Sequence, residues 1–361
     1  MRGYVIDGLF LTQRTTGIQR YAYELTCELD KILEPNIVEI LIPQSANIDV
    51  TYTNIKVVRY GALHGIPWQQ VNFTRYARKN KLNCICLTNV LPILYPHGIV
   101  AIHDVSYKAN PQFFTSKRDR LSALWHRLNY WRAAHSLMKI ITVSEFSKLE
   151  ITRYYGIDPN RITVIYNAWQ HMNRIHAARD TFERYPRLNK GEYYFSMSTL
   201  AANKNFKWIL YAAKNNPEKQ FAIAGGGKLK GAAEAEGFAN LPNIQFLGYV
   251  SDEDAKALMC NCKAFLFPTL YEGFGIPPLE AIACGAKNII VSDTPCMREI
   301  YQDFAEYINP GDYRNPNLRC NSGISVHEIL NRYSWKSSAQ KLYNILMEEN
   351  DERCEQNQSW R

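Results

Sequence analysis

The sequence predicts an α/β protein with two Rossmann-like, parallel-sheet domains and an interdomain cleft. Short apolar strands alternate with helical patterns along the chain of 361 residues, which is typical of parallel sheets covered by helices on both faces. The strands fall into two sets of five or six, separated by a polar, weakly periodic stretch at residues 167–192. Ligands bind at the carboxyl ends of strands in such sheets, so we expect the site in the cleft.

Each expected strand is a run of aliphatic or aromatic residues bounded by polar or turn residues. In the first domain these runs are residues 4–10, 38–43, 55–60, 99–104 and 139–144. In the second domain they are residues 193–198, 221–226, 244–249, 264–268, 288–292 and 305–309. We place the domains at residues 1–170 and 171–332, followed by a helix and tail at residues 333–361.

Composition and charge narrow the class of protein. Apolar residues make up 46% of the chain, no apolar run reaches the roughly 18 residues of a membrane-spanning helix, and the N-terminus lacks a signal-peptide pattern. The nine scattered cysteines have no zinc spacing, so we expect a cytoplasmic protein without structural disulfides. Residues 1–150 carry 18 basic and 11 acidic residues, which is +7 of the net +8. This excess indicates either a solvated surface or an anionic partner.

One segment, residues 270–293, combines two glutamates with a glycine loop and a helix start. Proline is favoured in the first helical turn, so the helix is expected to begin near Pro277 and to stop at Gly285. The prolines withhold their amides, so the loop before them must offer donors to an anion. Glu280 can accept hydrogen bonds from hydroxyls such as a ribose diol, and Glu272 can reach the other end of the same ligand. Alternatively, either glutamate alone only favours the helix dipole.

The stretch YEGFGIPPLEAIACG, residues 271–285, resembles the E-x7-E signature of retaining glycosyltransferases of family 4. Further segments occur in the family's order, at residues 15–25, 102–114, 141–151, 162–169 and 200–206. The resemblance implies the GT-B fold, an acceptor-binding first domain, a donor-binding second domain and a final helix that crosses back to the first. It also implies that Glu280 binds the ribose of a nucleotide sugar and that Glu272 contacts the transferred sugar.

The resemblance assigns further residues. Glu272, His103 and Lys204 are the catalytic candidates: His103 would contact the donor sugar, and Lys204 would neutralise the donor diphosphate. Without the resemblance, His103 is just as well explained as a structural histidine, and Lys204 is just as well explained as a surface lysine. The family often has an arginine at the positions of Thr199 or Asn203, so one positive charge is missing here. The donor-binding candidates are Gly17, Thr199, Lys204, Gly226, Gly273, Phe274, Gly275, Ile276 and Glu280.

No metal or cofactor is expected. The Asp-x-Asp pair at Asp252 and Asp254 resembles the metal motif of the other main glycosyltransferase fold, but Ser251 and Asp254 fit a helix-capping pattern instead. The glycines at residues 225–227 lack the dinucleotide-binding spacing, so they line the nucleotide site or form a tight turn.

The helical pattern at residues 118–135 has two faces. Its apolar positions are expected to form a packed face: Leu121, Leu124, Trp125, Leu128 and Trp131. The other face carries Arg118, Arg127 and Arg132, which are candidates for contact with a membrane or a lipid-diphosphate acceptor.

These observations favour a glycosyltransferase of polysaccharide, O-antigen or capsule synthesis. The expected partners are a nucleotide-sugar donor, with GDP-mannose as first choice, and a glycan or polyprenyl-diphosphate-linked acceptor. An anionic membrane surface at the inner face of the membrane is a further expected partner, and nucleic acid is not. Two alternatives stay open: a GT-B sugar-nucleotide epimerase, and a catalytically weak GT-B subunit that binds a glycan or a partner protein.

Overall fold

The structure is a computed structural model that describes residues 3–197, 199–225, 231, 233–234, 238, 241–313, 318 and 326–358. The chain divides into two compact units. The first contains Met1–Asn167 and Trp335–Arg361, and the second contains Ala168–Ser334. These divisions lie close to the boundaries expected from the sequence, at residues 170/171 and 332/333.

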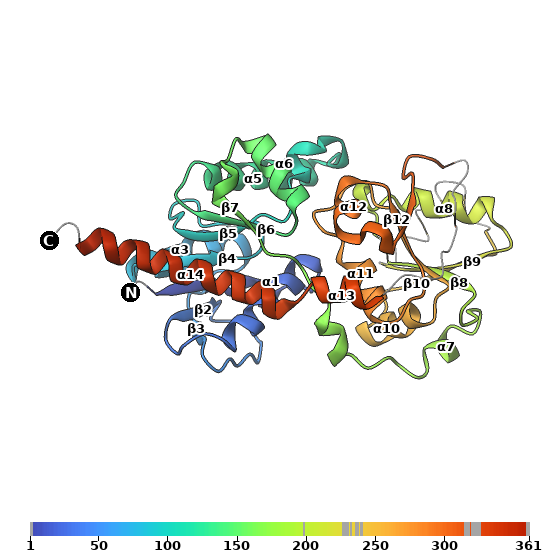
Figure 1. Ribbon diagram of the computed structural model, residues 1–361, viewed down its shortest axis with the longest axis horizontal. Helices are drawn as coiled ribbons and strands as arrows, with labels where there is room; N and C mark the ends of the chain where they lie inside the picture. The colour runs from blue at the N-terminus through green and yellow to red at the C-terminus, as the bar shows by residue number, and fades with distance from the viewer. Residues whose placement is uncertain are drawn as a thin grey trace. The chain divides into compact units, whose positions relative to one another are not determined.

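The first unit is built on a seven-stranded parallel sheet with the order β3-β2-β1-β4-β5-β6-β7 (Figure 1). Its strands are β1 (Tyr4–Asp7), β2 (Val38–Ile42), β3 (Lys56–Arg59), β4 (Asn83–Cys86), β5 (Gly98–Ala101), β6 (Lys139–Thr142) and β7 (Ile162–Val164). The expectation of five or six strands was wrong for this unit, because the predicted set lacks β4 and β7. The first of these begins with a buried asparagine and contains two cysteines, and the second has only three residues.

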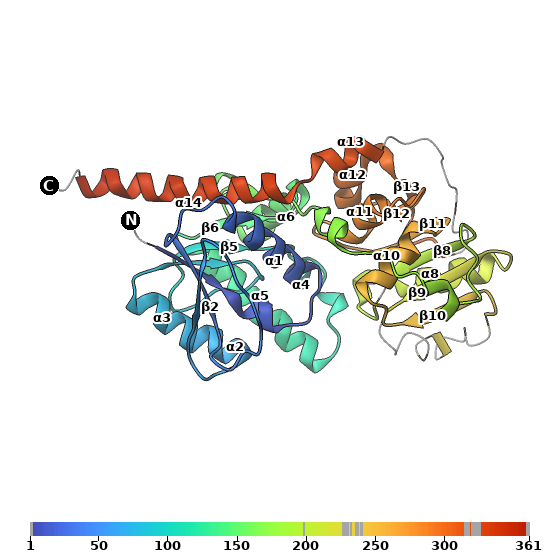
Figure 2. The same cartoon turned by 90° about the horizontal axis from the view of Figure 1, so that it is seen from below.

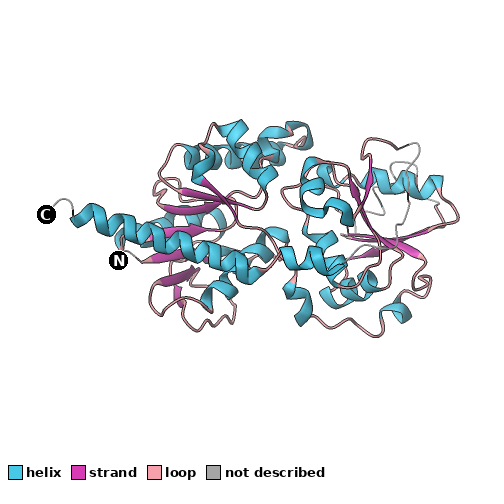
Figure 3. Ribbon diagram, viewed as in Figure 1, coloured by secondary structure: helices cyan, strands magenta, loops and turns pink. Residues whose placement is uncertain are grey.

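Helices flank this sheet, as the secondary-structure colouring shows (Figure 3). They are α1 (Gly17–Asp30), α2 (Gly65–Pro67), α3 (Thr74–Lys79), α4 (Ser106–Ala109), α5 (Lys117–Ala134), α6 (Glu145–Tyr155) and α14 (Trp335–Gln358). The C-terminal helix α14 packs along α1 in this unit. The Tyr4 hydroxyl donates to the Leu346 carbonyl at 3.1 Å, and the Ser338 hydroxyl donates to the Tyr166 carbonyl at 2.7 Å. The end of the chain is thereby tied to its beginning.

The second unit is built on a six-stranded parallel sheet with the order β10-β9-β8-β11-β12-β13. Its strands are β8 (Tyr193–Met197), β9 (Gln220–Ala224), β10 (Ile244–Gly248), β11 (Ala264–Phe267), β12 (Ile289–Ser292) and β13 (Glu306–Ile308). Its helices are α7 (Thr181–Arg184), α8 (Phe206–Asn215), α10 (Asp252–Cys260), α11 (Ile276–Ala283), α12 (Pro295–Tyr301) and α13 (Val326–Arg332). All six strands were predicted.

The strand order of the second sheet determines where its site forms. Strands β8 and β11 are paired neighbours in the middle of the sheet, although they are far apart in sequence (Figure 2). The order reverses between them, and such a switch point leaves room for a ligand at the carboxyl ends. The loops after β8 and β11 contain Lys204 and Glu272, two of the candidates.

Candidate active site

The loop after β11 is held in one shape before helix α11 begins at Ile276. Gly275 has a φ of +79°, a conformation that residues with a side chain rarely adopt, so the backbone here favours glycine. The buried Tyr301 hydroxyl donates to the Gly275 carbonyl and accepts the Leu279 amide at 3.1 Å. These contacts fix the loop that contains Gly273, Phe274 and Gly275.

The predicted limits of this helix are confirmed. The prolines occupy its first turn, after the Gly275 cap. At the other end Gly285 has a φ of +92°, and its amide donates to the Ile282 carbonyl, while the Ala286 amide donates to the Ala281 carbonyl, each at 2.9 Å. This pair of bonds is a Schellman motif, which satisfies carbonyls that the helix end leaves open.

Lys204 and Glu272, both catalytic candidates, are in direct contact. Lys204 lies in the turn η6 (Ala202–Lys204) after β8, and its Nζ is 2.7 Å from Glu272 Oε1. The lysine side chain is 28% exposed and the glutamate side chain 14%, so the ion pair is partly exposed. Lys204 Nζ also lies 5.4 Å from the centre of the Phe267 ring, where a cation is attracted to the π face. This arrangement holds a positive charge ready at the switch point.

Asparagine side chains join the two loops. The Asn203 backbone carbonyl accepts the Leu270 amide at 2.7 Å, and the Asn203 side-chain amide donates to the Tyr271 carbonyl at 3.2 Å. Asn205 adopts a left-handed conformation, with φ of 51°, and donates to the Pro268 and Pro310 carbonyls at 2.9 Å each. Asn203 therefore holds the loop in place where the family often has an arginine.

Glu280 lies in the first turns of α11 and is paired with a residue that the sequence analysis did not single out. Its Oε1 accepts from His171 Nε2 at 2.8 Å. The His171 side chain is 1% exposed, and the Glu280 side chain is 17% exposed. The only available signal was the sequence NAWQH, which extends a family-like segment by two residues.

Three further donor-binding candidates lie in the loop after β8, in the first unit and outside the described residues. Thr199 is exposed in the loop after β8. Gly17 is the first residue of α1, in the first unit. Gly226 lies outside the residues that the structure describes. The roles of these three stay predictions.

His103 follows β5 in the first unit and is buried. Its Nε2 lies 2.9 Å from the Leu87 carbonyl, to which it donates, and its ring meets the Tyr21 ring edge to face at 4.8 Å between centroids. Burial lowers the pKa of His103, although the hydrogen bond to Leu87 opposes this shift. His103 is therefore neutral at pH 7, with the Nε2 hydrogen already engaged. Contact with a sugar stays a prediction for this residue.

The expected packed face of α5 was wrong for four of its five residues; the fifth, Trp125, is half-buried. Leu121, Leu124, Leu128 and Trp131 are 42–69% exposed, at helical spacing. Two of the arginines instead contact the protein: Arg127 Nε donates to the Tyr107 carbonyl at 2.6 Å, and Arg132 Nε to the Ile93 carbonyl at 3.1 Å. The helix thus presents apolar side chains to solvent, because alanines and Tyr130 fill the narrow face toward the sheet. Among the described residues, every helix is too short or too polar to cross a bilayer.

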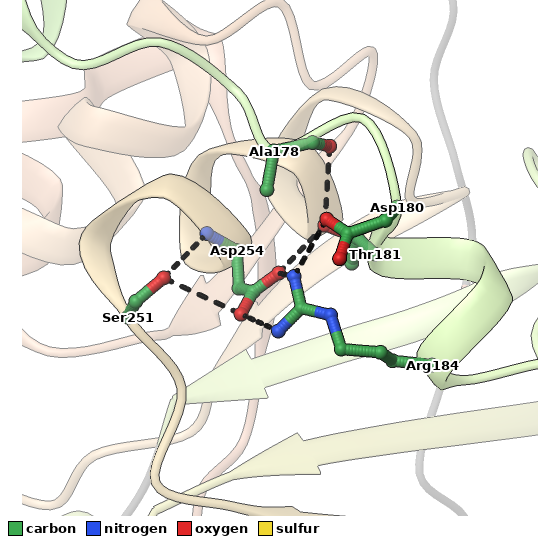
Figure 4. Close-up of polar contacts among 6 residues, drawn as sticks. All are labelled: Ala178, Asp180, Thr181, Arg184, Ser251 and Asp254. Carbon is green, nitrogen blue, oxygen red and sulfur yellow. Dashed lines mark hydrogen bonds and ion pairs between the residues drawn. The ribbon is translucent and has the colours of Figure 1, made fainter.

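The Asp-x-Asp pair forms part of a structural network (Figure 4). Ser251 caps α10 by accepting the Asp254 amide at 3.1 Å, as the capping pattern predicted. The Asp254 carboxylate accepts from Thr181 at 2.7 Å and from both Nη atoms of Arg184. Burial opposes ionisation of Asp254, but the hydrogen bonds from Arg184 and Thr181 outweigh it and lower its pKa. Asp254 therefore ties α10 to α7. Within the described ranges, no cluster of three or more His, Cys, Asp or Glu side chains could hold a metal.

Each of the two units is a parallel-sheet α/β domain, as in the GT-B class of glycosyltransferase folds. The family model Glycosyltransferase Family 4 matches residues 15–169, and the model Glycosyl transferases group 1 matches residues 178–312. The chain thus contains one domain that matches each of these two glycosyltransferase family models.

Similar proteins agree with this classification. O-antigen chain mannosyltransferase B of Escherichia coli is 27% identical over 69% of this chain and 65% of its own length. O-antigen chain mannosyltransferase RfbU of Salmonella typhimurium is 25% identical over 64% of this chain and 62% of its own length. The matched part of the chain thus spans somewhat less than two thirds of these relatives. Anabaena HepE in complex with UDP shares the fold, with a TM-score of 0.61 at 16% identity over 99% of this chain and all of that one.

Proposed function

We propose that the protein is a retaining glycosyltransferase that moves a hexose from a nucleoside-diphosphate sugar to a glycan or lipid-linked acceptor in surface-polysaccharide synthesis. The observation that carries this proposal is the cluster at the second sheet's switch point. There Lys204 and Glu272 form one partly exposed ion pair, and the loop between Glu272 and Glu280 is fixed by Gly275 and Tyr301. GDP-mannose is the first choice of donor, supported by relatives that are named mannosyltransferases.

In the proposed reaction, the bond between the sugar's anomeric carbon and the diphosphate oxygen breaks, and the acceptor hydroxyl oxygen forms a new bond on the same face. The hydroxyl proton passes to the leaving phosphate. Negative charge grows on the diphosphate, so its stabilisation by Lys204 and loop amides contributes most. Glu272, released from Lys204, would accept a hydroxyl of the transferred sugar, and Glu280 would accept the ribose diol. No step requires a metal.

The test offers the purified protein GDP-mannose, UDP-glucose and other nucleotide sugars, with a short polyprenyl-diphosphate-linked glycan as acceptor. We expect transfer from one donor, and a product with the donor's anomeric configuration by NMR. A product with the opposite configuration would overturn the retaining mechanism. Donor binding with no turnover, even with acceptors of several structures, would favour the alternative of a weakly active scaffold subunit.

We also propose peripheral attachment to an anionic membrane surface, where a lipid-linked acceptor would be found. The support is the exposed apolar stripe of α5, defined as Leu121, Leu124, Leu128 and Trp131. Exposed Lys117, Arg118 and Arg120 lie at the start of the same helix. Apolar side chains beside basic ones are typical of helices that lie in the membrane interface. In this proposal the leucines, rather than Arg127 and Arg132, make the lipid contact.

Flotation with vesicles that contain phosphatidylglycerol tests whether the leucines of α5 make the lipid contact. Replacing Leu121, Leu124 and Leu128 by serine should weaken vesicle binding at least about tenfold, because even partial burial of three leucines contributes more than about 1.4 kcal/mol. Leu149→Ser is the matched control, since Leu149 is 68% exposed on α6 of the same unit. Unchanged binding by the triple variant would remove α5 from the membrane contact.

A further inference from the structure

His171 and Glu280 form a partly buried pair, and the proposed reaction gives a role to Glu280 but none to His171. His171 lies in the short helix η5 (Gln170–Arg174), where the chain enters the second unit. Its Nε2 is 2.8 Å from Glu280 Oε1, and its side chain is 1% exposed. Because a carboxylate only accepts hydrogen bonds, the His171 nitrogen must carry the hydrogen.

The turn that holds His171 is anchored to the same unit on both sides. Trp169 Nε1 donates to the Leu330 carbonyl at 2.8 Å, and Gln170 Nε2 donates to the Tyr333 carbonyl at 2.9 Å. Lys256 Nζ donates to the Met172 carbonyl at 2.8 Å. With its neighbours in the sequence held to α13 and α10, the imidazole has a fixed position from which to orient Glu280.

The hydrogen bond from His171 engages only one of the two carboxylate oxygens of Glu280. One oxygen, Oε1, accepts from His171, whereas Oε2 has no hydrogen-bond partner in the part of the chain that the structure describes. A carboxylate has about four acceptor positions, so a diol can still bind to it. The Glu280 side chain is 17% exposed, which leaves a path for the ligand. A glutamate that is already ordered loses less rotamer freedom when it binds.

We propose that His171 is a positioning residue that orients the Glu280 carboxylate for the ribose diol of the donor nucleotide. This inference rests on the proposed function, because it assigns the ribose to Glu280. His171 itself does not touch the nucleotide in this proposal. Its contribution is to the discrimination between ribose and deoxyribose, and therefore to the affinity for the nucleotide part of the donor.

The test compares binding of GDP and 2′-deoxy-GDP, and of UDP and 2′-deoxy-UDP, by calorimetry. The intact protein should bind the ribonucleotide about ten- to a hundredfold more tightly than its deoxy form, because a hydrogen bond to a charged group is lost. In His171→Leu this ratio should fall at least about threefold. His171→Gln keeps an N–H donor near the position of Nε2 and should retain most of the ratio.

Tyr193→Phe is the matched control. Tyr193 is buried in the same unit and donates to the Leu258 carbonyl at 2.7 Å, so the variant loses one buried hydrogen bond away from Glu280. We expect a lower melting temperature and an unchanged ratio. If His171→Leu behaves in the same way, the residue is structural only and the inference is wrong. If the intact protein binds neither diphosphate, the proposed function fails, and this inference fails with it.

Discussion

Replacing Lys204 with methionine tests the charge at the centre of the proposed site. Methionine keeps an apolar chain against the Phe267 ring but removes the ammonium that lies 2.7 Å from Glu272. If this ammonium also contacts the donor diphosphate, its loss removes a charge-assisted hydrogen bond of about 1.5–3 kcal/mol. The Kd for GDP, measured by calorimetry, should therefore rise roughly ten- to a hundredfold.

The same variant should change stability much less than binding. The ion pair is partly exposed on both sides, and such pairs contribute about 1 kcal/mol or less, which corresponds to a shift of a few degrees in melting temperature. Lys263→Met is the control, because Lys263 is an exposed lysine of the same unit whose Nζ lies 5.8 Å from the Tyr194 ring centre. A GDP affinity that changes by the same small factor in both variants would refute the assignment of Lys204 to the diphosphate.

Three further predictions concern other groups. Glu272→Gln should lower kcat more than it weakens GDP binding, because its proposed partner is the transferred sugar; normal turnover would exclude that role. Transfer should survive EDTA, since Asp254 is engaged by Arg184 and Thr181; activity lost in EDTA and restored by Mn²⁺ would contradict this. Burial raises the pKa of Asp7 to about 6, although hydrogen bonds from Gln69 and Leu9 act to lower it. Ionisation of Asp7 therefore destabilises the fold as the pH rises from about 4 to 6. Asp7→Asn should therefore raise the free energy of unfolding at pH 7.5 by up to about 3 kcal/mol and have little effect at pH 4; an equal effect at both values would refute it.

The sequence was most informative where local pattern and tertiary environment agree. Each strand of the second sheet is a mostly apolar run, from the buried β11 to the half-buried β13, and all six were predicted from their residues. Strand β4 of the first sheet was not predicted, because an asparagine and two cysteines are not typical strand residues. All four of its residues are nevertheless buried. Strand β7 was not predicted either, although Ile162–Val164 is a run of β-branched residues.

In the candidate site, too, local features could be predicted from the sequence and long-range contacts could not. The loop before α11 and both ends of that helix follow from local chemistry, namely glycines with positive φ and prolines in a first turn. The pairing of Lys204 with Glu272 depends on β8 and β11 being neighbours, which no local pattern specifies. His171 is 109 positions from Glu280, and a single histidine in a polar stretch gives no sign of its partner.

Helix α5 shows why an amphipathic pattern does not by itself say which face is buried. Its apolar positions recur at helical spacing, which normally indicates a face packed on the core. Here the inward face consists of Ala123, Tyr130 and Ala133, together with Asn129, whose amide donates to the Trp125 carbonyl at 2.8 Å. Arginines can also serve as inward residues when carbonyls are available, because their long stems pack against apolar surface while the guanidinium donates. Arg127 and Arg132 do this through Tyr107 and Ile93, so a charge on a helix is not evidence of the solvent side. The leucines of α5 therefore form an apolar surface that is exposed to solvent. The membrane proposal rests on this surface.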